Sequence, residues 1–511
     1  MATYYFRSTG TNWGTAGDWS ATPSPTYSAG AVPTTADNAV FEAASANCTI
    51  NTGATRNCVN LTCTNYLGIL TFNTNLNVTG NVALGSATMS MTGSSTLALS
   101  TAGTTLSLSS AGCTCSVPMT MTKTGTGATI TVTFASWVQS GAFTFSSNSQ
   151  IWIWNSSTFT LKGNVAWNYT GFVNGTTTVL LAPDINTTMT FTGTFVRPSI
   201  SAFTINGAGT ININISEFQM DVTTFTYTAG TVTHTGTFYL GFSVGRTIAI
   251  NSPCLTMQNG STSTAGGTTI NLSSDISFSG NFTIPSSSPT INPAGRTINV
   301  AGNYSNGGAM AGSANIAMTG TGSVSGVSST AQANPLIINT SGTITFSGSI
   351  AWLRTLTFTA GTIVNTNSTI TCNSASTFTL NAAGFSFATF STTSNSTFTG
   401  TEGCTFTTFT AQTAGTTHTF QSTDTYTITS ALNLLGTAAS ALTFRSSTAA
   451  SLAIVTLRAG ASLDVGHVTA TDINSSNGRT IWVYKGSIGA NTLNWQQLPT
   501  IPKTVGETWV R

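Results

Sequence analysis

Two acidic residues, Glu217 and Asp221, form the closest pair of carboxylates in the central, repetitive part of the chain. Enzymes that cleave glycosidic bonds need two carboxyl groups about 5 to 9 Å apart, one as the acid and the other as the base or nucleophile. On an extended strand, residues four positions apart face the same side at a distance of about 13 Å. Only a bend or a bulge would bring these two carboxylates within range. We therefore assign no catalytic residues and keep Glu217 and Asp221 as an alternative.

The eight cysteines and three histidines do not combine into a metal-binding pattern. Cys113 and Cys115 would place two thiols on one face of a strand, but no histidine lies near them to complete a zinc site. Most cysteines stand in strand-like contexts, and we expect them to be small apolar core residues. His234 and His418 each lie between two threonines and are predicted to face outward. We expect neither a metal nor a cofactor.

Aromatic residues gather between residues 134 and 172, and five of them are candidate binding residues: Trp137, Trp152, Trp154, Trp167 and Tyr169. Their faces would suit a carbohydrate or a second subunit. The alternative is that wide coils need large core side chains. In the segment 151–154, two tryptophans share one face of a strand and two isoleucines share the other. Because both faces are apolar, we expect one of them to meet another chain or loop, and we predict a homotrimer.

The elements that must position these residues are short β-strands. Charged residues make up only 5% of the chain and hydrophobic residues 40%, whereas soluble domains have roughly 25% charged residues. Threonine, serine, asparagine and glycine replace the missing charge, and these residues are poor helix formers. Apolar residues alternate with threonine or asparagine, as in 129–134, 211–215 and 343–346. This alternation predicts strands whose outer face is covered by threonine.

A repeated segment indicates how the strands are arranged. Ile276–Phe282 and Ile298–Tyr304 share the same alternation and the same Gly-Asn break, and Gly280 and Gly302 are 22 residues apart. That offset suits one coil of a β-solenoid. We expect the glycines to supply a positive φ at the corners. The fold class predicted is all-β, a parallel β-helix with about 18 to 20 coils spaced about 4.8 Å apart.

The composition changes at both ends of the repeat region. We predict an aromatic-rich N-terminal cap over residues 1–45, which would cover the open strand edges of the solenoid. The repeat body would extend over 46–465, with the aromatic-rich insertion at 134–172. Residues 466–511 would form a C-terminal cap followed by an extended tail that begins at Leu498.

Threonine pairs of the form Thr-x-Thr recur along the chain, for example at Thr131–Thr133, Thr405–Thr407 and Thr425–Thr427. A flat array of such pairs on a β-solenoid can bind ice. Sheets twist unless something holds them flat, and coils of variable length would disturb a regular plane. We therefore do not expect an ice-binding surface.

Charge and hydropathy exclude several classes of partner. The net charge is +2, and the 14 lysines and arginines form no patch or run, so we expect no nucleic-acid partner. No apolar run reaches the roughly 18 residues that span a membrane. The first residues lack the basic and apolar regions of a secretory signal, so we expect folding in a cytoplasm.

The N-terminal segment carries a resemblance to a known group of proteins. It contains Asn12-Trp13-Gly14, Asp18-Trp19-Ser20 and the stretch AVPTTADNAVF at 31–41, followed by CTIN at 48–51 and LTCT at 61–64. This opening resembles that of Thr/Gly/Asn-rich β-repeat structural proteins of environmental tailed bacteriophages. A similar opening occurs in bacterial surface and secreted β-repeat proteins.

The resemblance implies a non-enzymatic virion structural protein, a fibre, tail or capsid-decoration rod that binds other virion proteins and a glycan of the host surface. It implies a location in the virion, assembled in the host cytoplasm. Two alternatives stay open. One is a bacterial surface adhesin located at the cell surface or outside the cell, and the other is a tailspike-type polysaccharide depolymerase that would use Glu217 and Asp221.

Overall fold

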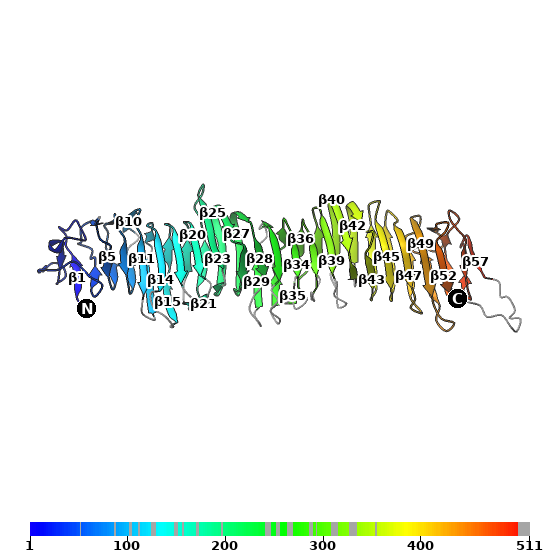
Figure 1. The fold of residues 1–511 in the computed structure, drawn as a ribbon, viewed down its shortest axis with the longest axis horizontal. Helices are drawn as coiled ribbons and strands as arrows, with labels where there is room; N and C mark the ends of the chain where they lie inside the picture. The colour runs from blue at the N-terminus through cyan, green and yellow to red at the C-terminus, as the bar shows by residue number, and fades with distance from the viewer. Residues whose placement is uncertain are drawn as a thin grey trace. The chain divides into compact units, whose positions relative to one another are not determined.

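The computed structural model is nearly all β, with about 60% of the residues in strands and no α-helix in the part of the chain that it describes. The strands stack in parallel as the coils of a β-solenoid of about 17 turns (Figure 1). The prediction of a parallel β-helix is thus confirmed, with slightly fewer coils than expected. The structure describes residues 1–51, 53–85, 88–101, 105–110, 113–123, 129–147, 152–155, 158–169, 173–195, 198–240, 247–251, 256–262, 269–285, 290–292, 294–307, 315–326, 335–352 and 355–498.

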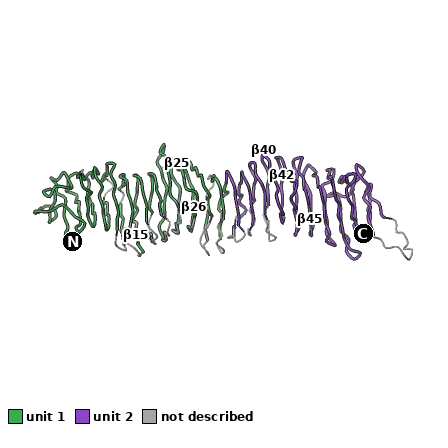
Figure 2. The backbone as a smooth tube through the Cα atoms, viewed as in Figure 1, with its two compact units in different colours: residues 1–277 green, residues 278–511 purple. Residues whose placement is uncertain are grey.

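The chain divides into two compact units, Met1–Ser277 and Phe278–Arg511 (Figure 2). We call them unit 1 and unit 2. This division does not test the predicted boundaries after residues 45 and 465, which stay predictions. The tail predicted from Leu498 falls at 499–511, outside the described residues.

In unit 1, most coils contribute three strands, and strands in corresponding positions of successive coils pair with each other, except that β10 does not pair with β13. The first strands of the coils are β4 (Cys48–Ile50), β7 (Ile69–Phe72), β10 (Ser90–Gly93), β13 (Thr114–Cys115), β16 (Trp137–Gln139), β19 (Thr158–Leu161) and β22 (Thr178–Leu181). The second strands are β5 (Arg56–Cys58), β8 (Leu76–Val78), β11 (Leu97–Thr101), β14 (Met119–Lys123), β17 (Phe143–Ser147), β20 (Val165–Tyr169) and β23 (Thr188–Phe195). The third strands are β6 (Leu61–Thr64), β9 (Val82–Gly85), β12 (Thr105–Ser109), β15 (Ile130–Ala135), β18 (Trp152–Asn155), β21 (Val173–Gly175) and β24 (Pro198–Ser199).

Later coils of unit 1 merge the first two strands into one long strand. β25 (Ala202–Asn214) pairs with both β22 and β23 on one side. On its other side it pairs in parallel with β27 (Thr224–His234) of the next coil. The shorter strands β26 (Glu217–Met220) and β28 (Thr237–Leu240) pair with each other alongside.

In unit 2, two parallel sheets carry the candidate site and the surface discussed below. One sheet contains β40 (Leu336–Ser347), β42 (Thr355–Val364), β44 (Ser376–Leu380), β46 (Ser396–Gly400), β48 (Thr417–Phe420), β50 (Leu442–Ser446), β53 (Val468–Thr471) and β56 (Ser487–Ile488). The other contains β41 (Ser349–Trp352), β43 (Thr369–Cys372), β45 (Ser386–Thr392), β47 (Thr405–Ala411), β49 (Thr425–Leu435), β51 (Ala453–Leu457) and β54 (Ile473–Asn474).

The N-terminal segment closes the first coil of unit 1 with aromatic rings. Trp13, Trp19, Phe6 and Phe41 are fully buried and contact one another edge-on or tilted, with ring centroids 4.9 to 6.0 Å apart. The Trp19 indole donates a hydrogen bond to the Trp13 carbonyl at 2.7 Å. β2 (Trp19–Ser20) runs antiparallel to β1 (Thr3–Phe6) and covers its outer edge. A covered edge offers no template for pairing with another chain.

The Gly-Asn break is a corner at which one coil is tied to the next. The Asn281 side chain accepts a hydrogen bond from the Asn303 backbone at 2.8 Å, and Asn303 accepts one from Ser323 at 2.8 Å. The expected positive φ is wrong at Gly302, as it is at Gly80 and Gly163. At Gly302, a Cβ atom would lie 2.7 Å from the carbonyl of Gly280 in the coil below. Glycine is needed there because the two backbones approach closely.

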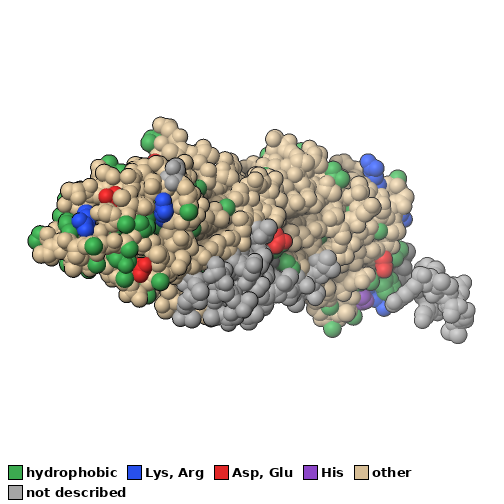
Figure 3. Space-filling view, turned by 60° about the vertical axis from the view of Figure 1, so that its left-hand side comes forward, with side chains coloured by type: hydrophobic (Ala, Val, Ile, Leu, Met, Phe, Trp, Pro, Cys, Tyr) green, Lys and Arg blue, Asp and Glu red, His purple; other side chains and the backbone are tan. Residues whose placement is uncertain are grey.

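The surface carries little charge. On the face shown in Figure 3, acidic and basic side chains are few and scattered, and uncharged polar side chains and backbone cover most of the described surface. In the described part of the chain, no helix has the length and hydrophobicity to cross a membrane.

Candidate functional site

The structure separates the environments of the two carboxylates singled out from the sequence. Glu217 is exposed at the start of β26 and accepts a hydrogen bond from the Gln219 side chain at 3.0 Å. Asp221 follows directly after that strand ends and is only 1% exposed. The two do not share one exposed face of a strand, because the strand does not continue to Asp221.

The four predicted binding tryptophans fill the core of unit 1. Trp137, Trp152 and Trp154 are fully buried, and Trp167 is 1% exposed. They contact other aromatic rings of the same interior, as in the contact of Trp154 with Trp167 at 5.4 Å. A ring without exposed surface offers no face to a glycan or a subunit, so these four are core residues of the folded chain. The side chain of Tyr169, at the end of β20, lies outside what the structure describes.

The prediction that two histidines face outward is wrong. His418 is fully buried and His234 is 8% exposed. In Thr417-His418-Thr419 the threonines take the outer face of β48, so the histidine takes the inner one. Burial lowers the pKa of both rings to about 4, so both are neutral at physiological pH.

His418 is hydrogen-bonded on both sides, whereas His234 is not. The Nδ1 atom of His418 lies 2.8 Å from the Ser396 hydroxyl, and its Nε2 atom lies 3.1 Å from that of Thr416. Neither ring nitrogen of His234 has a hydrogen-bond partner among the described residues. The Ile215 backbone opposes the fall in the pKa of His234, although the contact does not have the geometry of a hydrogen bond.

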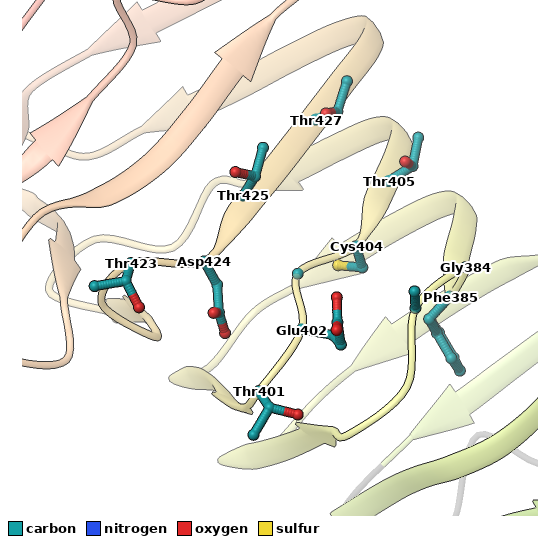
Figure 4. A pocket seen from close by; sticks show the side chains of 12 residues that line it. Gly384, Phe385, Thr401, Glu402, Cys404, Thr405, Thr423, Asp424, Thr425 and Thr427 are labelled. Carbon is teal, nitrogen blue, oxygen red and sulfur yellow. The ribbon is translucent and has the colours of Figure 1, made fainter.

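A pocket of about 380 Å³ lies at one corner of three successive coils in unit 2. Its walls come from the turn before β45, the turn between β46 and β47, and the turn before β49. Two carboxylates line it, Glu402 and Asp424, on neighbouring turns (Figure 4). The other lining residues are mostly threonine, glycine and backbone, with the buried Cys404 beneath. This pocket is the candidate site that the geometry supports best.

Electrostatics make the two carboxylates unequal. Burial raises the pKa of Asp424, and the negative charge of Glu402 raises it further. The Oδ2 atom of Asp424 is buried and has no hydrogen-bond partner among the described residues. The one ion pair among those residues joins Lys162 and Asp184 in unit 1, so none of them neutralises the pair. Burial and a like charge nearby both favour the protonated form of Asp424.

The backbone at the pocket is tightly constrained. A Cβ atom on Gly403 would lie 1.8 Å from the Thr425 carbonyl oxygen. Thr423, beside Asp424, has a φ of 71°, which is unusual for a β-branched residue. Its amide donates to the Leu452 carbonyl at 2.7 Å, and the Asp424 carbonyl accepts from the Ile454 amide at 2.9 Å. The turn is thus tied to the coil above it.

A signal for this pair was present in the sequence. Glu402 and Asp424 are 22 residues apart, as are Ser396 and His418 on the same two coils. In a solenoid, residues separated by one coil length are neighbours, whereas spacing along a strand detects only pairs such as Glu217 and Asp221.

The cysteines offer no alternative chemistry. The seven cysteines in the described residues are buried and free, and burial raises their pKa values, as for Cys113 to about 11. No group of three or more histidine, cysteine or acidic residues within the described ranges could hold a metal ion. Cys113 and Cys115 therefore act as apolar core residues there, each fully buried.

Comparison of the chain with protein-family models, with curated proteins and with solved structures gave no match.

Proposed function

We propose that the chain is a non-enzymatic structural protein of a bacteriophage virion, a fibre, tail or capsid-decoration component that recognises a glycan of the host surface. The observation that carries the proposal is the coil-to-coil pairing within each unit. Strands of one coil bond to the next in parallel register, and their corners are tied by asparagines such as Asn303. Such an array provides a long, regular body without any need for catalysis.

Two further features support a structural role. The surface is poor in charge, which suits a body that packs against other proteins along its length. All seven described cysteines are free and buried, as expected of a protein folded where thiols stay reduced. The resemblance of the N-terminal segment to phage β-repeat proteins points in the same direction.

The proposal includes assembly with other virion proteins and a homotrimer. Ile153, between the two buried tryptophans of β18, is half-buried on the outer face of that strand, and it supports a contact with a second chain. Sedimentation at micromolar concentration should show three copies, and a stable monomer would contradict the trimer.

The test of the virion proposal is localisation on the particle. An antibody against the chain, coupled to gold, should label assembled phage particles at one defined structure in electron micrographs. Labelling of the bacterial cell surface in uninfected cells would refute the proposal and favour the adhesin. Particles without label, from lysates in which the chain is abundant, would also refute it.

A tailspike-type depolymerase is the second candidate, and the pocket at Glu402 and Asp424 favours it. Asp424, with its raised pKa, would act as the general acid, and Glu402 as the second carboxylate. Replacement of both by amides, Glu402→Gln with Asp424→Asn, should abolish any release of sugar from host capsule. The matched control is Glu217→Gln with Asp221→Asn. Equal degradation by the wild type and the first double variant would exclude this site.

A further inference from the structure

Unit 2 presents an array of threonines on the outer face of one parallel sheet. It consists of Thr-x-Thr pairs on the consecutive strands β42, β44 and β46, and we call it the threonine array. Its members are Thr355, Thr357, Thr377, Thr379, Thr397 and Thr399. The register places them in two columns that run across the strands. The first column is Thr355, Thr377 and Thr397, and the second is Thr357, Thr379 and Thr399. Thr419 of β48 extends the first column.

Variation in coil length does not disturb the columns. Thr377 follows Thr355 by 22 residues, and Thr397 follows Thr377 by 20, yet these residues pair directly. The register has no shift across the three strands. The difference in length is taken up in the turns, so irregular coils still give a regular surface.

A ladder of stacked rings lies beneath two of the three strands of the array and continues under β48. Phe378 and Phe398 stack at 5.0 Å with 16° between their planes, and Phe398 and Phe420 stack at 5.2 Å with 9°. These rings point inward from β44, β46 and β48. Adjacent strands in ordinary sheets are rotated by about 20 to 25°, and side-chain ladders are one means of keeping a sheet flat. The register thus removes one objection raised by the sequence, variable coils. The ring ladder is a feature of the kind that opposes the other, twist.

The array is a lattice of one chemical group. Its threonines are half-buried on the outer face of the sheet, and every member carries the same methyl and hydroxyl groups. The rows are spaced about 4.8 Å apart across strands and about 6.6 Å along each strand. The Thr379 and Thr399 hydroxyls lie 3.2 Å apart, which aligns this column. Among the described residues, the charged ones nearest in register and sequence are Arg445 on β50 and Glu402 after β46, and both lie outside the array. Arg354, which precedes Thr355, lies outside the described residues.

We propose that the threonine array binds the surface of ice crystals. A soluble ligand is bound by polar groups that converge in a concave pocket, whereas this surface repeats identical groups in two directions. It fits a ligand that also repeats in two directions. Water oxygens on the prism faces of hexagonal ice repeat at distances close to both spacings of the array. Methyl groups between the hydroxyls order the adjacent water, and the uncharged side chains of the array leave that water free to match the lattice. The inference does not depend on the proposed function.

The test is ice growth in the presence of the full-length protein. The wild type should lower the freezing point without lowering the melting point, shape growing crystals and slow recrystallisation. Thr379→Lys, at the centre of the array, should lose this activity because a long charged side chain breaks the plane.

Thr160→Lys is the matched control, since Thr160 is a half-buried outer threonine of β19 whose strand neighbours are Val138 and Leu180. It should keep full activity. Circular dichroism should show that both variants fold. A wild type without effect on ice growth would overturn the proposal. Equal activity of the wild type and Thr379→Lys, or equal loss in both variants, would overturn it as well.

Discussion

The buried His418 makes unit 2 sensitive to acid. Its hydrogen bonds fix the neutral tautomer: Thr416 donates its hydroxyl proton to the Thr413 carbonyl at 2.7 Å, so its oxygen must accept from Nε2–H of His418. Nδ1 then accepts from the Ser396 hydroxyl. A second proton would place a charge in a site that is fully buried and faces Phe409, whose ring centroid is 5.9 Å away.

The sign and size of the effect follow from the pKa. The ordinary value is 6.5, and the folded value is about 4 because burial disfavours the charged ring. The unfolded chain therefore binds more protons between these values. The contribution of His418 to stability is complete above pH 6.5, is lost as the pH falls from 6.5 to 4, and changes no further below that. At about 1.4 kcal/mol per pKa unit, the loss is about 3 kcal/mol.

The assay is urea unfolding followed by circular dichroism at pH 7.5 and at pH 4. Carboxylates also titrate in this range, so the measured quantity is the difference between the wild type and Ser396→Ala with His418→Phe. That double variant removes the titrating ring and the hydroxyl it would leave unpaired. Between the two pH values, the free energy of unfolding should fall about 3 kcal/mol more in the wild type than in the variant. Equal pH dependence of the two proteins would refute the reasoning.

Three further perturbations test the packing. Gly403→Ala should destabilise the corner at the pocket by about 1 to 3 kcal/mol, because the added Cβ would lie 1.8 Å from a backbone oxygen. Gly17→Ala is the control, since a Cβ there would meet no atom within 4 Å. Thermal unfolding should show a much smaller loss of stability for the control. Asn303→Ala should cost about 0.5 to 1.5 kcal/mol, because it removes an exposed acceptor of the Ser323 amide and hydroxyl at 2.8 and 3.0 Å. Amide exchange at Ser323 should accelerate, and unchanged exchange would contradict the corner bond. Trp154→Ala should lower stability by about 3 to 5 kcal/mol, because the ring is fully buried, and an unchanged melting temperature would argue against its core position.

Local patterns in the sequence were sufficient to predict the architecture. The offset between Gly280 and Gly302 gave the coil length, and Ser396 and His418 show the same 22-residue separation across a coil. Alternation in segments such as 211–215 identified the inner residues, since Ile211 and Ile213 are both buried. These properties depend on short-range periodicity, which a single sequence displays directly.

The differences between prediction and structure concern two things that a single sequence does not show directly. One is which face of a strand points inward, and the other is which residues of different coils lie side by side. The Thr-His-Thr context predicts an outward His418, although the flanking threonines already occupy the outer face of the strand and leave the inner face to the histidine. Trp152 and Trp154 lie in the core, which is the alternative that the sequence leaves open, because alternation shows that they share a face but not that this face is the inner one. The pair of Glu402 and Asp424 was missed because they are neighbours across a coil and not along a strand.

The near-constant separation of paired strands also sets how the chain folds. Within each unit, hydrogen-bonded partners such as Asn281 and Asn303, or Asn303 and Ser323, are 22 and 20 residues apart. The entropy lost in closing such a segment grows only slowly with its length, so each added coil meets a similar barrier. No step requires a distant part of the chain to arrive first. A unit can therefore begin folding on whichever coils emerge earliest from the ribosome and lengthen by one coil at a time.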